Sequence, residues 1–593
     1  MGIQGLASFI KYRGEILTDD HFRHSRLIID GSSIFHFLYS TSRVDQQHGR
    51  DYDDFEDQVC EFFKALRDCS IEPYVVIDGG SDHTDRKFET LRQRVQSKIN
   101  NLSMGLQEDT IIPVLVKQVF KQVLSSLNVP FAQCIFEVDQ EIASLAQRWN
   151  CPVLSNDSDF NIFDIQAGYL PILHFQWQNV SVQGGSSQNY IPCKRYTTTS
   201  FCSHFNINRQ LLPVFAAIAG NDYVNLQDMG FSIKWEDCPP MESNWKSTSG
   251  SHFNINRQLL PVFAAIAGND YVNLQDMGFS IKWEDCPPME SNWKSRVVFF
   301  NRLLDWLASF QEQQEALDSV PSLIGHGINR DNMDAALLAL SLSIETYQLQ
   351  PGCLERFFND GETPDPDLLP DHLSVLPHWT LLPLMRGKLS SYMIHILLLR
   401  PVIQAVQVED PKLPSGNITS RPIRQVFYGL LLGERREVEE YDREGTDLTS
   451  SKVEAILPSA AQQLQLDTLD QAPHSVRHEV FLETLGVSQS TLNGLPSHLK
   501  LPVAVTCYWR RHAHPQPDLP LLQALLLGLV YGELCRQRKG EEGTATVVVV
   551  VVWATVVVVW AIGVGYNGGG VASMVVVWAT VVVVGGGAVG GVG

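Results

Sequence analysis

Short hydrophobic runs alternate with amphipathic stretches along the first 235 residues of the chain. The clearest runs are 27–29, 74–77 and 152–154, which have the length and the aliphatic content of buried strands. The stretches between them repeat hydrophobic residues at helical spacing. This alternation is typical of an α/β domain with a mostly parallel sheet, and we predict such a domain over residues 1–235.

Each of these predicted strands leads into an acidic residue. Asp30 and Asp78 each precede a glycine, and the third strand leads into the pair Asp157 and Asp159. The carboxyl ends of parallel strands converge on one edge of a sheet, so these side chains can meet although they are far apart in the chain. On an extended backbone Asp157 and Asp159 share one face, because side chains alternate with a period of two.

A further acidic pair stands where a helix is predicted to begin. Glu137 and Asp139 precede an amphipathic run over 142–149. Residues two apart on a regular helix point in nearly opposite directions, so both carboxylates converge only within an irregular first turn. Asp139 and Glu141 offer an alternative register for this pair. The interval to Asp157 favours Glu137 and Asp139.

Each acidic motif taken alone has an ordinary structural explanation, since an Asp-Gly is commonly a turn and an acid at a helix start is commonly a cap. The whole set in one domain is harder to explain in that way. It meets the needs of two metal ions about 4 Å apart that hydrolyse a phosphodiester. The donors are hard oxygens, and the chain has no His/Cys cluster at zinc spacing, so the sequence favours Mg²⁺ or Mn²⁺.

One segment of the chain occurs twice without a change. Residues 203–247 recur as 251–295, joined by 248–250. Structural repeats diverge and need caps, whereas identical copies indicate a recent exon duplication or an error in the gene prediction. We therefore interpret 248–295 as a linker and a second copy. Asp222 and Asp270 are equivalent residues of the two copies, and we choose Asp222 because it lies nearer to Asp159.

The rest of the chain divides into two parts of different composition. Residues 296–543 repeat leucine at helical spacing between proline-rich breaks, which predicts an all-helical region. Residues 544–593 form a low-complexity Val/Gly tail without a charged residue. About 20 apolar residues suffice to span a bilayer. A translated simple repeat explains the composition better, and we expect no membrane association.

Charge limits how the chain can meet nucleic acid. A net charge of −21 argues against nonspecific coating of nucleic acid, so any contact must be local. The stretch 86–98 is the richest in basic residues, and on a helix Lys87, Arg94 and Lys98 would line one face. Such runs are usually solvated faces. The position directly after Asp78 favours a functional role here.

Cysteine usage bears on the compartment. The eleven cysteines include no CxxC pair and follow no secretory leader. Reduced, buried thiols are the expected state of such residues inside a cell. We expect an intracellular protein, with the nucleus favoured over the cytoplasm.

A series of short motifs occurs in order along the first 235 residues: Met1-Gly2-Ile3-Gln4-Gly5-Leu6, Ile29-Asp30-Gly31, Val76-Ile77-Asp78-Gly79, Glu137-Val138-Asp139, Asn156-Asp157-Ser158-Asp159 and Gly220-Asn221-Asp222-Tyr223. The series resembles the XPG/flap-endonuclease superfamily of PIN-like nucleases. The superfamily's Gly-x-Gly turn, which grips duplex phosphates, is not matched, because 224–230 contains one glycine.

The resemblance implies roles for particular residues. Seven acids are implied to be catalytic and to bind two Mg²⁺ or Mn²⁺ ions: Asp30, Asp78, Glu137, Asp139, Asp157, Asp159 and Asp222. A second set is implied to contact DNA, with Lys87 and Arg92 as the expected ligands of the scissile phosphate: Gly2, Lys87, Arg92, Arg94 and Lys98.

Two further segments, 421–431 and 499–509, resemble signatures of asteroid proteins within that superfamily. This resemblance implies a structure-specific, metal-dependent nuclease that hydrolyses branched or overhanging DNA, with DNA repair as its setting. It also implies an alternative, a catalytically inactive interaction protein with a nuclease fold, linked to epidermal-growth-factor-receptor signalling. Structured DNA is the expected partner, and protein partners are expected to bind the helical region.

Overall fold

The computed structural model describes residues 2–3, 5–42, 52–80, 88–103, 111–113, 115–135, 138–182, 188–222, 224, 226, 229, 291–324, 330–349, 352–365, 371–407, 410–514 and 516–539. Glu137 and Lys87 lie outside these residues, as do 230–290, which hold most of the second repeat copy, and the tail 544–593.

The chain folds into two compact units, each built from separate stretches of sequence. One unit, here called the sheet unit, contains 19–156, 165–195 and 349–593. The other, here called the helical unit, contains 1–18, 157–164 and 196–348.

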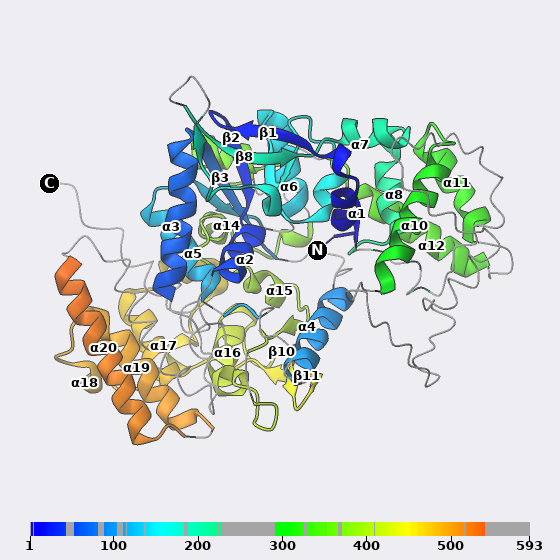
Figure 1. The fold of residues 1–593 in the computed structure, drawn as a ribbon. Helices are drawn as coiled ribbons and strands as arrows, with labels where there is room; N and C mark the ends of the chain where they lie inside the picture. Colours follow the sequence, from blue (N-terminus) through cyan, green and yellow to red (C-terminus); the bar gives the residue numbers. More distant parts are fainter. Residues whose placement is uncertain are drawn as a thin grey trace, which may run out of the picture. The chain divides into compact units, whose positions relative to one another are not determined.

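A five-stranded sheet lies at the centre of the sheet unit, in the order β4-β3-β2-β5-β6 (Figure 1). All its strand pairs are parallel. The strands are β2 (Arg26–Asp30), β3 (Glu72–Ile77), β4 (Phe131–Gln133), β5 (Val153–Ser155) and β6 (Tyr169–Pro171). The parallel sheet predicted from the sequence is thus confirmed.

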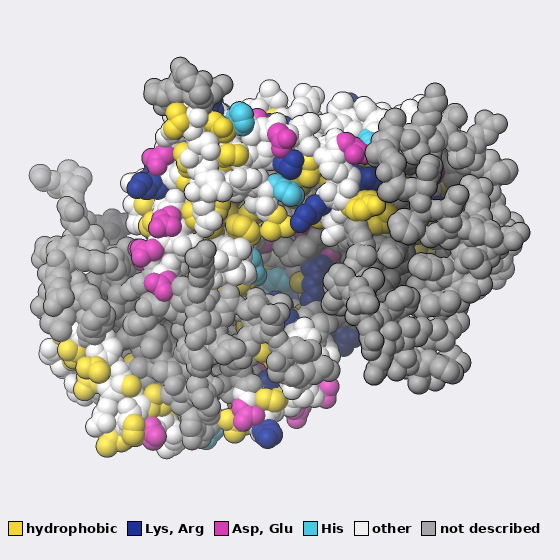
Figure 2. All heavy atoms as spheres, in the orientation of Figure 1, with side chains coloured by type: hydrophobic (Ala, Val, Ile, Leu, Met, Phe, Trp, Pro, Cys, Tyr) yellow, Lys and Arg dark blue, Asp and Glu magenta, His cyan; other side chains and the backbone are white. Residues whose placement is uncertain are grey.

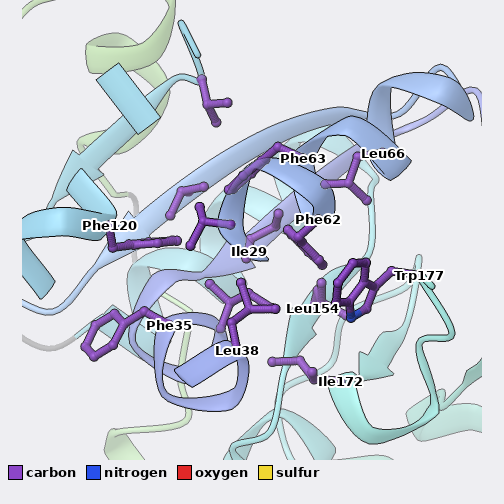
Figure 3. Close-up of a cluster of buried hydrophobic side chains, with 14 of the residues drawn as sticks. Ile29, Phe35, Leu38, Phe62, Phe63, Leu66, Phe120, Leu154, Ile172 and Trp177 are labelled. Atoms are coloured by element: carbon purple, nitrogen blue, oxygen red, sulfur yellow. The ribbon is translucent and has the colours of Figure 1, made fainter. Parts of the chain in front are cut away.

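Helices cover both faces of this sheet. On one face, Leu27 and Ile29 of β2 join a core with side chains of α2 (Gly31–Thr41), α3 (Tyr52–Asp68) and α5 (Val116–Ser126), part of which is drawn in Figure 3. Strand alternation turns Ile28 toward the opposite face. There α6 (Val138–Trp149) packs against β2, β3 and β5. Burial on both faces explains why these strands are continuous hydrophobic runs.

A second sheet in the same unit has the order β1-β8-β7. It consists of β1 (Thr18–Phe22), β7 (Ser181–Val182) and β8 (Asn189–Arg195). The carboxylate of Asp20 in β1 accepts hydrogen bonds from the Arg195 guanidinium of β8. Lys194 pairs with Asp19 at 2.8 Å on the exposed surface.

The C-terminal part of the sheet unit is largely helical, as the leucine pattern predicted. Its helices are α13 (Leu354–Asp360), α14 (His378–Met385), α15 (Tyr392–Leu397), α16 (Asn417–Leu432), α17 (His474–Leu485), α18 (Gln489–Leu492), α19 (Ser497–His512) and α20 (Leu519–Lys539). It also contains a small sheet that the sequence did not predict, with β9 (Val402–Ile403) parallel to β10 (Glu437–Glu444) and β11 (Asp447–Glu454) antiparallel to β10.

A buried ion pair joins α16 to that small sheet. The Arg424 guanidinium donates two hydrogen bonds to the Glu440 carboxylate, at 2.6 and 2.7 Å. Tyr428 donates to the same carboxylate. Both charged side chains are almost fully buried, at 1% and 0% exposure. The asteroid-like segment 421–431 therefore contains residues that hold the fold together.

The helical unit packs around aromatic side chains. The ring of Phe9 lies 5.7 Å from Phe205 and 5.3 Å from Phe300, and Phe300 lies 5.6 Å from Phe215. The helices are α1 (Leu6–Tyr12), α7 (Thr198–Phe205), α8 (Leu212–Ala219), α10 (Ser291–Leu307), α11 (Gln313–Ile324) and α12 (Arg330–Glu345). Residues 203–222 of the first repeat copy are thus part of this packed unit.

Membrane-spanning helices are absent from the described part of the chain, where no helix combines the necessary length with sufficient hydrophobicity.

Candidate functional site

Asp30 ends the central strand β2 and begins the helix α2. One carboxylate oxygen, Oδ1, accepts a hydrogen bond from the Ser33 backbone N–H at 3.0 Å, and Oδ2 accepts one from the Ser155 hydroxyl at 2.6 Å. Asp30 therefore caps α2 and is also tied to the end of β5. Burial, followed by the neighbouring Asp78 carboxylate, raises the pKa of Asp30 to about 6. Two carboxylates thus face each other at one edge of the sheet.

Asp78 follows β3 on a loop whose position is tightly fixed. A Cβ at Gly79 would lie 2.0 Å from the Cys134 carbonyl oxygen, so only glycine allows this close approach. The Gly80 N–H donates to the Ile135 carbonyl at 2.9 Å. The Lys117 ammonium donates to the Asp78 carbonyl at 3.2 Å. The loop therefore holds Asp78 against the segment that leads into α6.

Asp139 and Glu141, the alternative acidic pair, have different surroundings in the first turn of α6. Asp139 is half-buried there. Glu141 instead accepts hydrogen bonds from the backbone N–H groups of Cys353 and Leu354, so it caps the start of α13, and burial raises its pKa. These contacts occupy Glu141 in a structural role. They do not support the register that would use Asp139 and Glu141 as the metal-binding pair.

Asp157 and Asp159 belong to the helical unit and are both buried. Asp157 caps the short 3₁₀ helix Ser158–Asn161, because its Oδ1 accepts the Asp159 N–H at 3.0 Å. The two side chains offer carboxylate oxygens within 4.8 Å of each other. That spacing allows both to bind one cation.

The N-terminal residues lie against this aspartate pair. Gly2 has a φ of +74°, and a Cβ at this position would lie 2.4 Å from Asp157 Oδ1 and 2.7 Å from Asp159 Oδ1. The Ser158 hydroxyl donates to the Ile3 carbonyl at 3.1 Å. Gly2, expected from the sequence to approach DNA, therefore contacts two of the expected metal ligands.

Asp222 lies in a turn after α8 and is 8% exposed. The Asn221 N–H donates to the Val224 carbonyl at 2.9 Å, and the Val224 N–H donates to Asn221 Oδ1 at 3.0 Å. This reciprocal pair closes the turn around Asp222. The equivalent Asp270 of the second copy lies outside the described residues.

Comparison with known proteins identifies the family. The XPG N-terminal domain family matches residues 1–101. The single-strand DNA endonuclease ASTE1 of Danio rerio is 41% identical over 564 residues, which cover 91% of this chain and 72% of that protein. The chain belongs to the asteroid family. The Drosophila melanogaster protein asteroid is 32% identical over 275 residues, which cover 38% of this chain and 32% of that protein.

A likeness also exists among solved structures. The catalytic core of Rad2 in complex with DNA substrate is 19% identical to this asteroid-family chain. The match covers 37% of this chain and 61% of that chain, with a TM-score of 0.27.

Three of the expected DNA-binding cations, Arg92, Arg94 and Lys98, lie on α4 (Phe88–Ser103) of the sheet unit. This helix packs on the β10–β11 hairpin, where the Phe88 ring lies 5.2 Å from the ring of Tyr441. Burial, followed by the charge of Glu439, raises the pKa of Tyr441. Arg92 is exposed and lies close enough to Tyr441 to oppose this shift. Arg94 and Lys98 are partly buried. Figure 2 shows Lys and Arg side chains at the place where Figure 1 draws α4.

Sequence reasoning missed two residues beside Asp78. Burial, then the charge of Lys98, lowers the pKa of His36 to about 4, while Asp78 opposes this effect and Lys117 adds to it. His36 on α2 and Lys117 on α5 therefore lie near the Asp78 carboxylate, and Lys98 lies near His36. His36 could have been predicted as a site residue, because it lies on the helix that Asp30 caps. The sequence held no signal for Lys117, because only the folded chain brings α5 to the Asp78 loop.

Proposed function

We propose that this chain is a divalent-metal-dependent nuclease that hydrolyses phosphodiester bonds in DNA carrying single-stranded, branched or overhanging parts. The observation that carries the proposal is the position of Asp30 and Asp78 at the carboxyl edge of a parallel sheet. The relatives that share most of the sequence are named single-strand DNA endonucleases. We further propose DNA repair in the nucleus as the setting.

The chain itself links the two groups of acids. Ser155, the last residue of β5, donates its hydroxyl hydrogen to Asp30 at 2.6 Å. Asp157 follows Ser155 by only two residues, and a chain extends at most about 3.6 Å per residue. We propose that Asp30, Asp78 and Asp139 act together with Asp157, Asp159 and Asp222, as the ordered motifs of the sequence imply. Glu137 remains a proposed member, because it lies outside the described residues.

The donor set fits Mg²⁺ or Mn²⁺, because carboxylate oxygens are the ligands that these hard cations prefer. Two buried acids at short distance also need a positive charge to remain ionised together. The lack of a side chain at Gly2 lets the backbone approach both carboxylates, because a Cβ there would lie 2.4 Å from Asp157 Oδ1 and 2.7 Å from Asp159 Oδ1. Bound ions would activate a water and stabilise the leaving oxygen.

Protein cations can complement the DNA locally despite the net charge of −21. Lys117 lies near Asp78 and Lys98 lies near His36, so an approaching phosphate could interact with both lysines. The low pKa of His36 keeps its imidazole neutral at pH 7, so it can donate or accept a hydrogen bond without repelling Lys98.

Purified wild-type protein should cut DNA in Mg²⁺ or Mn²⁺ and stop when EDTA is added. The measurement is cleavage of end-labelled single-stranded, flap, overhanging and blunt duplex DNA of one sequence. We expect cutting within or next to single-stranded parts and little cutting of the blunt duplex. Absence of cleavage on every substrate in both metals would refute the nuclease proposal and favour an interaction protein that keeps the fold.

Replacing Gly2 with alanine should weaken Mn²⁺ binding and cleavage by about tenfold or more, since displacement by about 1 Å can cost a hundredfold. The added Cβ would overlap Asp157 Oδ1, and its φ of +74° is strained for alanine. Gly14→Ala is the matched control, because a Cβ there meets no atom within 4 Å. Equal metal affinity and activity in the two variants would contradict the contact between Gly2 and the aspartates.

A further inference from the structure

We propose that Asn221 and Tyr347 form a hydrogen-bond relay that positions Asp159 and Asp222 for metal binding. The inference rests on the proposed nuclease function and adds two positioning residues to it. Asn221 stands beside Asp222 in the motif 220–223, but it is not one of the expected ligands, and Tyr347 lies in none of the motifs of the sequence. Both residues belong to the helical unit.

The orientation of the Asn221 amide is fixed by its neighbours. Its oxygen Oδ1 accepts the Val224 N–H at 3.0 Å. The amide nitrogen Nδ2 therefore faces the other way, where it donates to the Ser343 hydroxyl at 2.8 Å and to the Tyr347 hydroxyl at 3.1 Å. An amide nitrogen carries two hydrogens, and these two bonds use both of them.

The use of both Asn221 amide hydrogens determines the direction of the hydrogen bond between Tyr347 and Asp159. The Tyr347 hydroxyl oxygen accepts a hydrogen from Asn221, and its single hydrogen remains to be donated. It points to Asp159 Oδ1, which lies 3.0 Å away. Asp159 is consequently held as a hydrogen-bond acceptor, and a donor on one lone pair fixes the direction of the others.

Packing prevents the relay from moving away. Asp159 is 2% exposed, Tyr347 is 6% exposed and Ser343 is 1% exposed. The Tyr347 ring lies 5.3 Å from the ring of Phe163, and Ser343 lies within α12, which packs against α8. The turn that carries Asp222 follows α8 directly. The same amide therefore sets the Asp222 turn and, through Tyr347, the Asp159 carboxylate.

The relay is tested with Tyr347→Phe, which keeps the ring and removes only the donor. We expect Mn²⁺ affinity and kcat to fall by about 10- to 100-fold, the usual range for partners of metal ligands, with KM for DNA changed less than about twofold. Mn²⁺ affinity is measured by calorimetric titration without DNA, so this readout does not depend on cleavage.

Tyr508→Phe is the matched control. Tyr508 is 1% exposed and donates its hydroxyl hydrogen to the Thr419 carbonyl at 2.9 Å, and neither residue is a proposed ligand. Both variants lose one buried hydroxyl, so a purely structural effect should lower the unfolding temperature in both and leave Mn²⁺ affinity at the wild-type value in both. Equal affinity of wild type and Tyr347→Phe would overturn the relay.

The two proposals can fail separately. A wild type that binds Mn²⁺ but cuts no DNA would refute the nuclease proposal, and the relay would still be supported by a tenfold difference in affinity. A wild type that cuts DNA, with a Tyr347→Phe variant that binds Mn²⁺ and cuts equally well, would refute the relay alone. A wild type that binds no Mn²⁺ would refute both.

Discussion

Asp78→Ala should lower the rate of DNA cleavage by about three orders of magnitude or more, while DNA affinity measured in Ca²⁺ stays within about threefold. Metal ligands stabilise charge that develops in the transition state, and several kcal/mol of lost stabilisation corresponds to about a thousandfold in rate. The Asp78 loop should keep its conformation, because Gly79, Gly80 and the bond from Lys117 hold its backbone.

Asp19→Ala provides the comparison for Asp78→Ala. Asp19 is an exposed aspartate of β1 that pairs with Lys194 at 2.8 Å, and such surface pairs contribute little to stability. Single-turnover cleavage by wild type and both variants distinguishes the loss of a metal ligand from a general effect of substitution and from a contaminating nuclease. The proposal requires Asp19→Ala to cut like wild type. Equal residual cutting by wild type and Asp78→Ala would indicate a contaminating nuclease.

Asp30→Asn should abolish cleavage and yet stabilise the metal-free protein at neutral pH. The folded protein raises the pKa of Asp30 from 3.8 to about 6, so the fold favours the protonated carboxyl. Its contribution to stability is present at low pH and is lost as pH rises through about 6. The interval between these pKa values corresponds to about 3 kcal/mol. Asparagine removes the charge and keeps the cap on Ser33.

Thermal unfolding in EDTA between pH 4.5 and 8 measures this effect. The difference between Asp30→Asn and wild type reports on Asp30 and its interaction with Asp78, because all groups remote from Asp30 titrate alike in both proteins. We expect a small difference between the midpoints at pH 4.5 and a much larger one at pH 8, with Asp30→Asn the more stable protein. Added Mn²⁺ should raise the midpoint of wild type more than that of the variant. A constant difference across the pH range would show that Asp30 does not carry a buried charge.

The five-stranded sheet and its acids could be predicted because the signals are local. A strand buried on both faces is a hydrophobic run, and the residue after it reaches the carboxyl edge wherever parallel strands pair. Asp30 and Asp78 could therefore be placed together without knowing the loops between them. The interval to Asp157 favoured Glu137 over Glu141, but the sequence could not reveal the role of Glu141, because the cap that it forms on α13 joins residues 212 positions apart, 141 to 353.

The small sheet after residue 400 was not predicted, because its strands lack the local hydrophobic signal that marked the central sheet. β10 reads Glu-Val-Glu-Glu-Tyr-Asp-Arg-Glu, with Val438, Glu440 and Asp442 buried on its inner face. Charged residues at inward positions conceal the hydrophobic alternation that marks a strand. Glu440 can be buried there because it forms an ion pair with Arg424, and this pair could not be predicted from the sequence. His36, Lys117 and Tyr347 were missed likewise, since each meets its partner only through the tertiary fold.

The bond between Tyr347 and Asp159 joins residues that are 188 positions apart in the chain, and it has a consequence for synthesis. At about 5–20 residues per second, a ribosome needs roughly 10–40 s to pass from one to the other. During that interval the nascent chain has already exposed Asp30, Asp78 and Asp159, but lacks the hydroxyl that holds Asp159. Asp159 therefore cannot acquire its final geometry until the 188 residues that end in Tyr347 have been added to the chain.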